Sequence, residues 1–176
     1  MAADAPSAAE RFGFLGPEIF PVGRGIDNLR QADLDGDGRR DLVLVNNLRS
    51  KITLLYNRTG GKPAKVTEDT VNALPPDARF RIESIPSEKR IASLVVADLN
   101  GDKKPDLAYY GEPKELLVQY REAKGWGPPK RWAVRDGQIS ANALGTGDLN
   151  GDGRTDLLLL RESKLYVLYQ DAKGAL

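Results

Sequence analysis

The 176-residue sequence contains neither cysteine nor histidine. These absences exclude disulfides, thiol chemistry, histidine general bases and the usual zinc sites, so any bound metal must be held by oxygen atoms. Long apolar runs are also missing, because stretches such as Leu157–Leu160 fall far below the roughly 20 residues of a membrane-spanning helix. The 26 lysine and arginine residues balance 25 aspartate and glutamate residues. The sequence therefore predicts neither membrane insertion nor nucleic-acid binding.

Helical patterns are scarce as well. The sequence contains 11 prolines and 18 glycines, and no window of about 11 residues keeps the apolar spacing of three and four that a helix shows. We therefore predict an all-β fold. Residues 1–11 lack the basic and apolar regions of a signal peptide, and we expect them to form a flexible N-terminus.

What the sequence does contain is a repeated aspartate-rich turn. The turn occurs three times, at offsets of 65 and 50 residues, each time between segments of strand character. A period of tens of residues predicts stacked structural units. The three copies are ADLDGDGRRDLVLV from Ala32, ADLNGDKKPDLAYY from Ala97 and GDLNGDGRTDLLLL from Gly147.

Each copy supplies three strand-like segments, and a propeller blade requires four. Candidates for the fourth strand precede each trio, at residues 12–25, 78–86 and 125–137. We therefore predict a β-propeller-like array of three four-stranded antiparallel blades, which is either a partial propeller or half of an oligomeric one. The expected units are repeat 1 over 12–58, a connecting loop over 59–74, repeat 2 over 75–123 and repeat 3 over 124–176.

The spacing of oxygen donors in the turns predicts metal binding. Calcium takes six to eight oxygens, and side chains at alternate positions of a tight loop can converge on one point. Crowding several carboxylates is costly unless a cation neutralises them. Numbering each turn from its first aspartate, the predicted ligands are the side chains at positions 1, 3, 5 and 9 and the carbonyl at position 7. They are Asp33, Asp35, Asp37, Arg39 and Asp41; Asp98, Asn100, Asp102, Lys104 and Asp106; and Asp148, Asn150, Asp152, Arg154 and Asp156.

The second turn differs from the other two at position 6. Gly38 and Gly153 occupy this position in the first and third turns, where the chain bends sharply and a positive φ is expected. Lys103 replaces glycine in the second turn. A side chain at positive φ is strained and a nearby cation opposes metal binding, so we expect this calcium site to be the weakest of up to three.

Three other interpretations of the turns are less favoured. Clusters of aspartate, glycine and asparagine also form ordinary polar turns, although three copies in register favour metal binding. An EF-hand would require flanking helices and a glutamate at position 12, where this chain has Leu44, Tyr109 and Leu159 inside β-type runs. The EF-hand interpretation therefore fails, and a dockerin-like module is disfavoured because it too requires helices.

The turns and their following apolar strands resemble the FG-GAP or VCBS repeats of integrin-α-type β-propellers, over roughly Phe12 to Gln170. The Phe-Gly and Gly-Ala-Pro signatures of that family are not evident, so the sequence is more similar to a bacterial VCBS-like member. The resemblance implies that the side chains at positions 1, 3, 5 and 9 of each turn hold calcium. It also implies an extracellular, cell-surface or periplasmic location, where calcium is abundant.

Three blades would leave two open edges. We expect further blades of a longer propeller, association of two copies into six blades, or a short open array capped by its own termini. The favoured function is a non-catalytic scaffold that binds protein or carbohydrate, with structural calcium. The alternative is part of a propeller enzyme, such as a calcium-assisted polysaccharide lyase or a phospholipase-like hydrolase. Trp126 and Trp132 either stack on a sugar or, as we favour, pack between blades.

Overall fold

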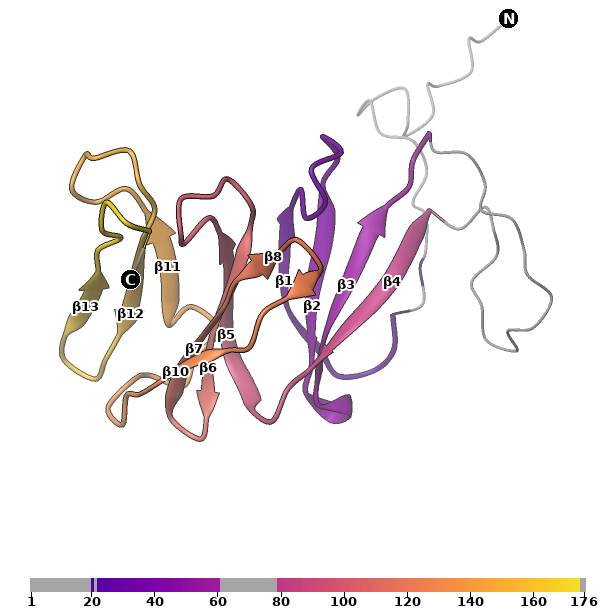
Figure 1. Cartoon of the computed structure of the whole chain (residues 1–176). Helices are drawn as coiled ribbons and strands as arrows, with labels where there is room; N and C mark the ends of the chain where they lie inside the picture. Colours follow the sequence, from indigo (N-terminus) through magenta and orange to yellow (C-terminus); the bar gives the residue numbers. More distant parts are fainter. Residues whose placement is uncertain (1–19, 21, 61–78, 175–176) are drawn as a thin grey trace, which may run out of the picture.

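The structure, a computed structural model, describes residue 20 and residues 22–60 and 79–174 (Figure 1). These residues form strands joined by turns, with one 3-10 turn at Asn47–Arg49, and the prediction of an all-β fold is confirmed. No helix within the described ranges is long and apolar enough to cross a membrane. The predicted flexible N-terminus, most of the candidate strand at 12–25 and most of the predicted connecting loop lie outside the described residues.

Two of the sheets contain four antiparallel strands. The first has the order β1-β2-β3-β4, and the second has the order β10-β7-β6-β5. The first comprises β1 (Ile26–Ala32), β2 (Asp41–Asn46), β3 (Lys51–Asn57) and β4 (Phe80–Pro86). The second comprises β5 (Arg90–Ala97), β6 (Asp106–Glu112), β7 (Glu115–Gln119) and β10 (Lys130–Ala133).

The remaining strands form two smaller sheets. The third sheet has three strands in the order β11-β12-β13, and a separate two-stranded ribbon pairs β8 with β9. The strands of the third sheet are β11 (Leu144–Gly147), β12 (Asp156–Leu160) and β13 (Leu165–Leu168), and those of the ribbon are β8 (Arg121–Glu122) and β9 (Gly125–Trp126). The prediction of three four-stranded blades is therefore wrong in its strand count, because the described chain forms four sheets with four, four, three and two strands.

The predicted position of the fourth strand is also wrong. Strand β4, expected to begin the second unit, pairs with β3 along its whole length, from Lys51 opposite Pro86 to Asn57 opposite Phe80. Strand β10, expected to begin the third unit, pairs with β7. The fourth strand thus follows its trio in the chain. The exposed edge of the third strand, β3 or β7, offers backbone N–H and C=O groups, and β4 or β10 forms antiparallel hydrogen bonds with them.

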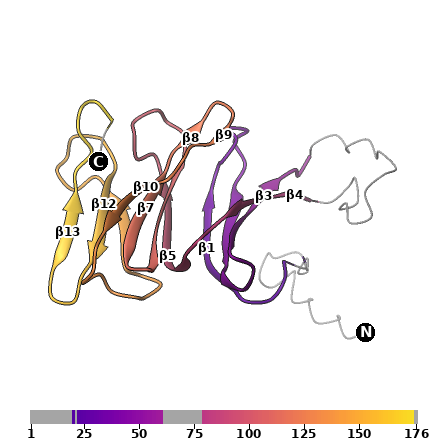
Figure 2. The same ribbon diagram turned by 60° about the horizontal axis from the view of Figure 1, so that its bottom comes forward.

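The three larger sheets stack face to face, with the second sheet in the middle (Figures 1 and 2). Alternation along β6 explains the arrangement, because successive side chains of a strand point to opposite faces. Leu107 and Tyr109 join the apolar cluster shared with the first sheet, whereas Ala108 and Tyr110 join the cluster shared with the third. All four side chains are buried, so the middle sheet has a core on each face.

Polar contacts between neighbouring sheets fix their relative placement. The side-chain amide of Asn47, the first residue of the 3-10 turn, donates to the carbonyl of Ile91 at 2.9 Å and accepts from the N–H of Ile91 at 2.8 Å, as the backbone of a paired strand residue would. The buried hydroxyl of Ser93 donates to the carbonyl of Ala141 and accepts from the N–H of Leu144. These contacts tie the first sheet to the second and the second sheet to the segment that leads into the third.

Candidate metal-binding turns

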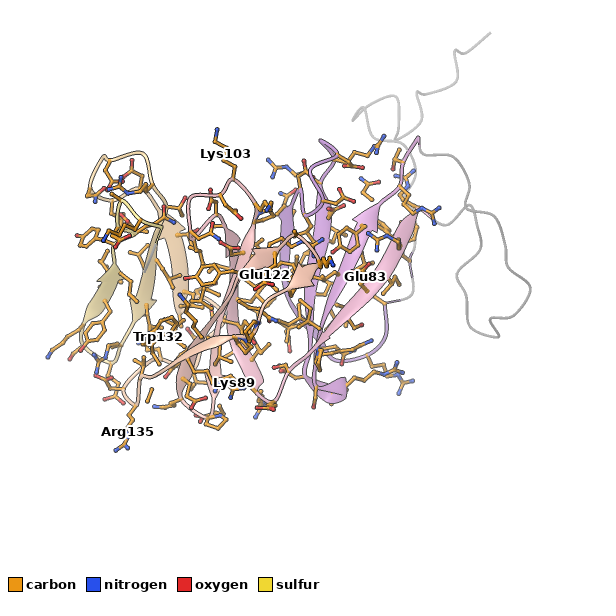
Figure 3. The ribbon with its side chains drawn as sticks, viewed as in Figure 1. Glu83, Lys89, Lys103, Glu122, Trp132 and Arg135 are labelled. Atoms are coloured by element: carbon orange, nitrogen blue, oxygen red, sulfur yellow. The ribbon has the colours of Figure 1, made fainter. Side chains whose placement is uncertain are left out.

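The three aspartate-rich turns connect β1 to β2, β5 to β6 and β11 to β12, and they lie at the same end of the stack (Figure 1). Figure 3 shows Lys103 at this end, while Lys89 and Arg135 mark the opposite end. Each turn starts just after one paired strand and ends where the next begins, with position 9 as the first residue of β2, β6 or β12. The stacking of the sheets therefore brings three equivalent turns to one surface.

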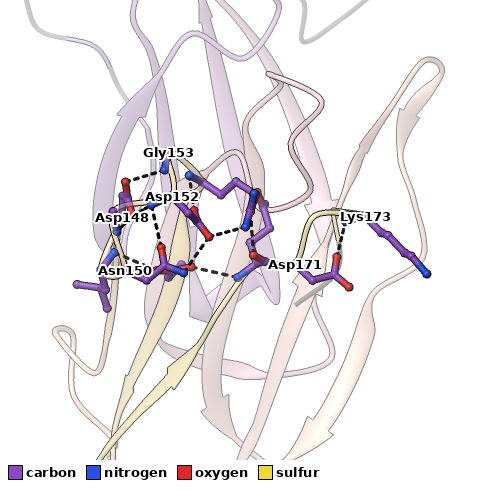
Figure 4. A network of polar contacts seen from close by, with 11 residues as sticks. Asp148, Asn150, Asp152, Gly153, Asp171 and Lys173 are labelled. Carbon is purple, nitrogen blue, oxygen red and sulfur yellow. Dashed lines mark hydrogen bonds and ion pairs between the residues drawn. The ribbon is translucent and has the colours of Figure 1, made fainter.

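The aspartate at position 1 organises the backbone of each turn. In the first turn, Oδ1 of Asp33 accepts from the N–H of Gly36 at 2.7 Å, and Oδ2 accepts from the N–H of Gly38 at 2.8 Å. Asp98 and Asp148 accept the equivalent pairs of bonds, and Figure 4 shows those of the third turn. The N–H of Gly153 is the largest cause that lowers the pKa of Asp148. Position 1 is thus a charged acceptor surrounded by amides.

Position 6 adopts a positive φ in all three turns, as predicted. The angle is 82° at Gly38, 81° at Gly153 and 66° at Lys103. Lys103 therefore adopts a conformation that costs an L-residue about 1 kcal/mol or more. The backbone of the second turn matches the others despite this cost, so the hydrogen bonds to position 1 outweigh the strain.

Positions 1, 3 and 5 converge most closely in the first turn. One carboxylate oxygen from each of Asp33, Asp35 and Asp37 lies within 4.8 Å of the other two. Among the described residues, this is the one such group of three acidic side chains. In the second and third turns position 3 is Asn100 or Asn150, so both turns have fewer carboxylates, although an amide oxygen can also bind calcium.

A basic side chain at position 7 pairs with the aspartate at position 5 in every turn. Sequence reasoning assigned only the backbone carbonyl of this residue and missed the ion pair. The basic residue two places after each position-5 aspartate was the available signal. The N–H and guanidinium of Arg39, the N–H more strongly, lower the pKa of Asp37. The pairs are Arg39–Asp37, Lys104–Asp102 and Arg154–Asp152.

The position-9 aspartates are completely buried, at 0% exposure. One carboxylate oxygen accepts from the backbone N–H at position 2 of the same turn, at 2.8–3.0 Å. The other accepts from a backbone N–H at or just beyond the end of the third strand, at 2.7–3.0 Å. Each of these aspartates therefore ties its turn to the end of the third strand of its sheet. They are Asp41, with donors Leu34 and Asn57; Asp106, with Leu99 and Arg121; and Asp156, with Leu149 and Gln170.

Burial changes the acidity of these carboxyl groups. It is the largest cause that raises the pKa of Asp41 above its ordinary value, against the opposing effect of the two N–H donors. For Asp106 burial raises the pKa to about 6, and the nearby charges of Asp102 and Asp98 add to the increase. A cation next to these groups would lower both pKa values, because it favours the charged form.

The first turn fits an oxygen-only cation site best. Its three clustered carboxylates offer oxygens at positions 1, 3 and 5, and each carboxylate oxygen that accepts one N–H keeps a second lone pair. Asp41 lies outside this cluster and directs both oxygens to backbone amides. The ligand assignments in all three turns stay predictions. In the structure the position-9 carboxylate accepts hydrogen bonds from backbone N–H groups, and the position-5 carboxylate forms an ion pair with the basic side chain at position 7.

A cavity of ≈ 460 Å³ separates the first turn from the second. Its charged lining residues are Asp33 and Asp35 of the first turn, Lys103 and Lys104 of the second turn, and Arg121 and Glu122. The cavity lining therefore carries charges of both signs.

The two tryptophans lie in the contacts between sheets. Trp126 packs against the cluster shared by the first and second sheets, and Trp132 packs against the cluster shared by the second and third (Figure 3). The guanidinium carbon of Arg121 lies 5.0 Å from the centroid of the Trp126 ring. This placement favours a packing role for both rings.

Residues 33–109 match the family model of the FG-GAP-like repeat. This match is consistent with an FG-GAP-type repeat family. The matched region begins at the first turn and ends in β6, so it contains the first two aspartate-rich turns. Searches of curated proteins and of solved structures find no match to the chain.

Proposed function

We propose that the chain is a calcium-stabilised FG-GAP-type repeat module and that its three stacked sheets are consecutive blades of a β-propeller-type arrangement. The observation that carries the calcium proposal is the clustering of three carboxylate oxygens in the first turn within 4.8 Å of one another. Three like charges at this separation repel one another unless a cation lies among them. The repeat match and the common placement of the turns support extending the proposal to the second and third turns.

In this function calcium is structural. A bound calcium ion would supply positive charge to a turn that connects the first two strands of a sheet. The protein would supply the oxygen ligands at positions 1, 3 and 5. Position 1 already orders the turn through its amide bonds, so the ion would add rigidity to a preformed loop. The module would then act as a non-catalytic scaffold, in an exported location, and present its turns to a protein or carbohydrate ligand. The cavity between the first and second turns is one concave surface at this end.

Calorimetry and thermal unfolding of the full chain test the calcium proposal. We expect heat of binding on titration with calcium and a higher melting temperature in calcium than in chelator, since a ligand at 100 times its Kd stabilises by about 2.7 kcal/mol. A double variant, Asp35→Asn with Asp37→Asn, should lose most of the binding heat at the first turn. The matched control is Asp27→Asn, which removes an exposed carboxylate outside the turns. Absence of binding heat together with equal melting temperatures would refute the proposal.

A binding role is tested separately with a glycan array and with pull-down by immobilised candidate proteins, both in calcium. Ligand capture that weakens when Asp35 and Lys104 are replaced by alanine would locate binding at the turn surface. Turnover of a polyuronide or an ester by the purified chain would instead support an enzyme.

A further inference from the structure

The second sheet concentrates positive charge next to its aspartate-rich turn. Three equivalent positions can be compared between the sheets: position 6, position 7, and the residue whose backbone N–H donates to Oδ1 of the position-9 aspartate. The first and third sheets have one cation at these positions, and the second sheet has three. The residues are Gly38, Arg39 and Asn57 in the first sheet, Lys103, Lys104 and Arg121 in the second, and Gly153, Arg154 and Gln170 in the third. All three cations of the second sheet line the cavity between the first and second turns.

Arg121 is an ordered cation in this lining. Its Nη1 donates to the hydroxyl oxygen of Tyr56 at 3.4 Å, and its guanidinium carbon lies 5.0 Å from the centroid of the Trp126 ring. Tyr56 is 1% exposed, so the hydroxyl is a fixed partner. Among the described residues, Arg121 forms no ion pair with a carboxylate. A guanidinium offers five N–H donors in a planar fork that fits oxyanions such as carboxylates. Arg121 therefore retains donors for a ligand.

Lys103 holds a second cation at the rim of the cavity despite backbone strain. Its φ is 66°, whereas glycine occupies position 6 in the other two turns. Figure 3 shows its side chain projecting at this end of the molecule. Within the part of the chain that the structure describes, the ammonium group has neither a hydrogen bond nor an ion pair. Strained residues that persist are concentrated at functional sites, and a strained lysine here indicates a role for its charge.

Carboxylates in the same lining oppose anion binding until a cation neutralises them. The cavity lining contains three of them, from Asp33, Asp35 and Glu122, and these balance the three cations. Calcium held at positions 1, 3 and 5 of the first turn would offset the charges of Asp33 and Asp35. The lining would then be positive, because the charges of Lys103, Lys104 and Arg121 would exceed that of Glu122.

We infer that this cavity binds an oxyanion, a carboxylate or a sulfate, when calcium occupies the first turn. The guanidinium of Arg121 donates to the oxyanion, and the two lysines supply further positive charge. The inference rests on the proposed function, because calcium must offset the carboxylates of the first turn. It adds the chemistry of the ligand, which carries a negative group at the turn surface.

Isothermal titration calorimetry of the full chain tests the inference with two anionic probes, inorganic sulfate and a galacturonate trisaccharide. A neutral galactose trisaccharide is the control. We expect heat of binding from an anionic probe in calcium, with roughly tenfold weaker binding in chelator and also at high ionic strength. Sulfate binding alone would indicate a free ion as the ligand, and tighter binding of the galacturonate would indicate an acidic carbohydrate. Either result supports the inference.

Two substitutions locate the binding. Arg121→Gln introduces the residue that the third sheet has at the equivalent position, and it should weaken anion binding roughly tenfold while calcium still binds. Lys103→Gly should weaken anion binding several-fold and also release the strained φ. The matched control is Arg135→Gln, which removes an exposed arginine at the opposite end of the stack (Figure 3) and should leave anion binding unchanged. Far-UV circular dichroism establishes that each variant is folded.

The outcomes separate this inference from the proposed function. Calcium binding without heat from either anionic probe would overturn the inference and leave the proposed function intact. Equal anion affinity in Arg121→Gln, or equal binding of the neutral trisaccharide, would also overturn it.

Absence of calcium binding would refute the proposed function, and a charge variant then tests the cavity in chelator. Asp35→Asn with Glu122→Gln removes two of the three carboxylates that line it. This double variant should bind an anionic probe roughly tenfold more tightly than the unchanged protein does. No gain in affinity would overturn the inference.

Discussion

The first and second aspartate-rich turns share one backbone but differ in charge. In both turns, the aspartate at position 1 accepts hydrogen bonds from three backbone N–H groups. The aspartate at position 9 is buried, and the residue at position 6 has a positive φ. The first gathers three carboxylates, whereas the second has Asn100 at position 3 and Lys103 at position 6. Positions 1 and 9 therefore determine the shape of the turn, so folding of the turn and attraction of a cation are separable properties.

The largest effect should come from the position-9 aspartates, where the two turns are alike. Asp41→Ala and Asp106→Ala each leave two backbone N–H groups without a carboxylate acceptor in a buried site. We expect each to lower the free energy of unfolding by about 2–5 kcal/mol in urea titrations. Asp35→Ala, on the exposed part of the first turn, is the control and should change it by less than about 0.5 kcal/mol in chelator. A small loss for either position-9 variant would contradict the structural role.

The second effect is a pH dependence that originates in Asp106. The unfolded chain releases this proton near the ordinary pKa of 3.8, whereas the folded chain retains it until about pH 6. The folded state binds more protons in this window, so rising pH lowers stability by at most ~1.4 kcal/mol per pH unit, or about 3 kcal/mol in all.

Urea unfolding in chelator at pH 4, 5, 6 and 7 measures this dependence. Asp106→Asn cannot titrate, so its stability relative to the unchanged protein should improve as pH rises from 4 to 6 and stay level above. Asp41→Asn should follow the same direction, because burial raises the pKa of Asp41 too. Parallel pH curves for all three proteins would show that burial does not shift these carboxyl groups.

A smaller effect follows from exchanging position 6 between the turns. Lys103→Gly removes a side chain from positive φ, and we expect about 1 kcal/mol of added stability together with tighter calcium binding at the second turn. Gly38→Ala should cost about 1 kcal/mol through φ alone, since no atom lies within 4 Å of the added Cβ. If both substitutions are neutral, positive φ at this position is not strained.

The smallest effect concerns the ion pair at position 7. Arg39→Ala frees the carboxylate of Asp37 from a competing cation, so calcium should bind the first turn several-fold more tightly by calorimetry. Because an exposed ion pair contributes little, the melting temperature in chelator should hardly change. Arg40→Ala, which removes the neighbouring positive charge without an ion pair to Asp37, is the control. Equal gains from both variants would indicate a general charge effect.

Sequence reasoning predicted the three turns, the strands around them and the positive φ at position 6, because these depend on short-range patterns. Aspartate spacing, glycine at a bend and apolar runs such as Asp41–Asn46 all lie within a few residues of one another. The rejection of an EF-hand is confirmed, since Leu44, Tyr109 and Leu159 lie in β2, β6 and β12.

The pairing of β4 and the burial of position 9 depend on contacts that local patterns do not contain. Strand β4 joins β3 across the interval from Asn57 to Phe80, and nothing in its own sequence states which neighbour it pairs with. Asp41 resembles any other acidic member of the turn, yet its second N–H donor is Asn57, at the far end of another strand. The sequence shows that a carboxylate is present. Only the assembled sheet determines whether that carboxylate accepts hydrogen bonds from backbone N–H groups or binds an ion.

The position of the second sheet between two neighbours determines the order in which the molecule comes apart. Neither face of β6 can meet water until the first or third sheet has moved away. Amide hydrogens of β6 should therefore exchange with solvent only through the most complete openings, while those of β13 exchange through local fraying. The second turn, which we expect to bind calcium most weakly, is attached to the segment that should remain folded longest.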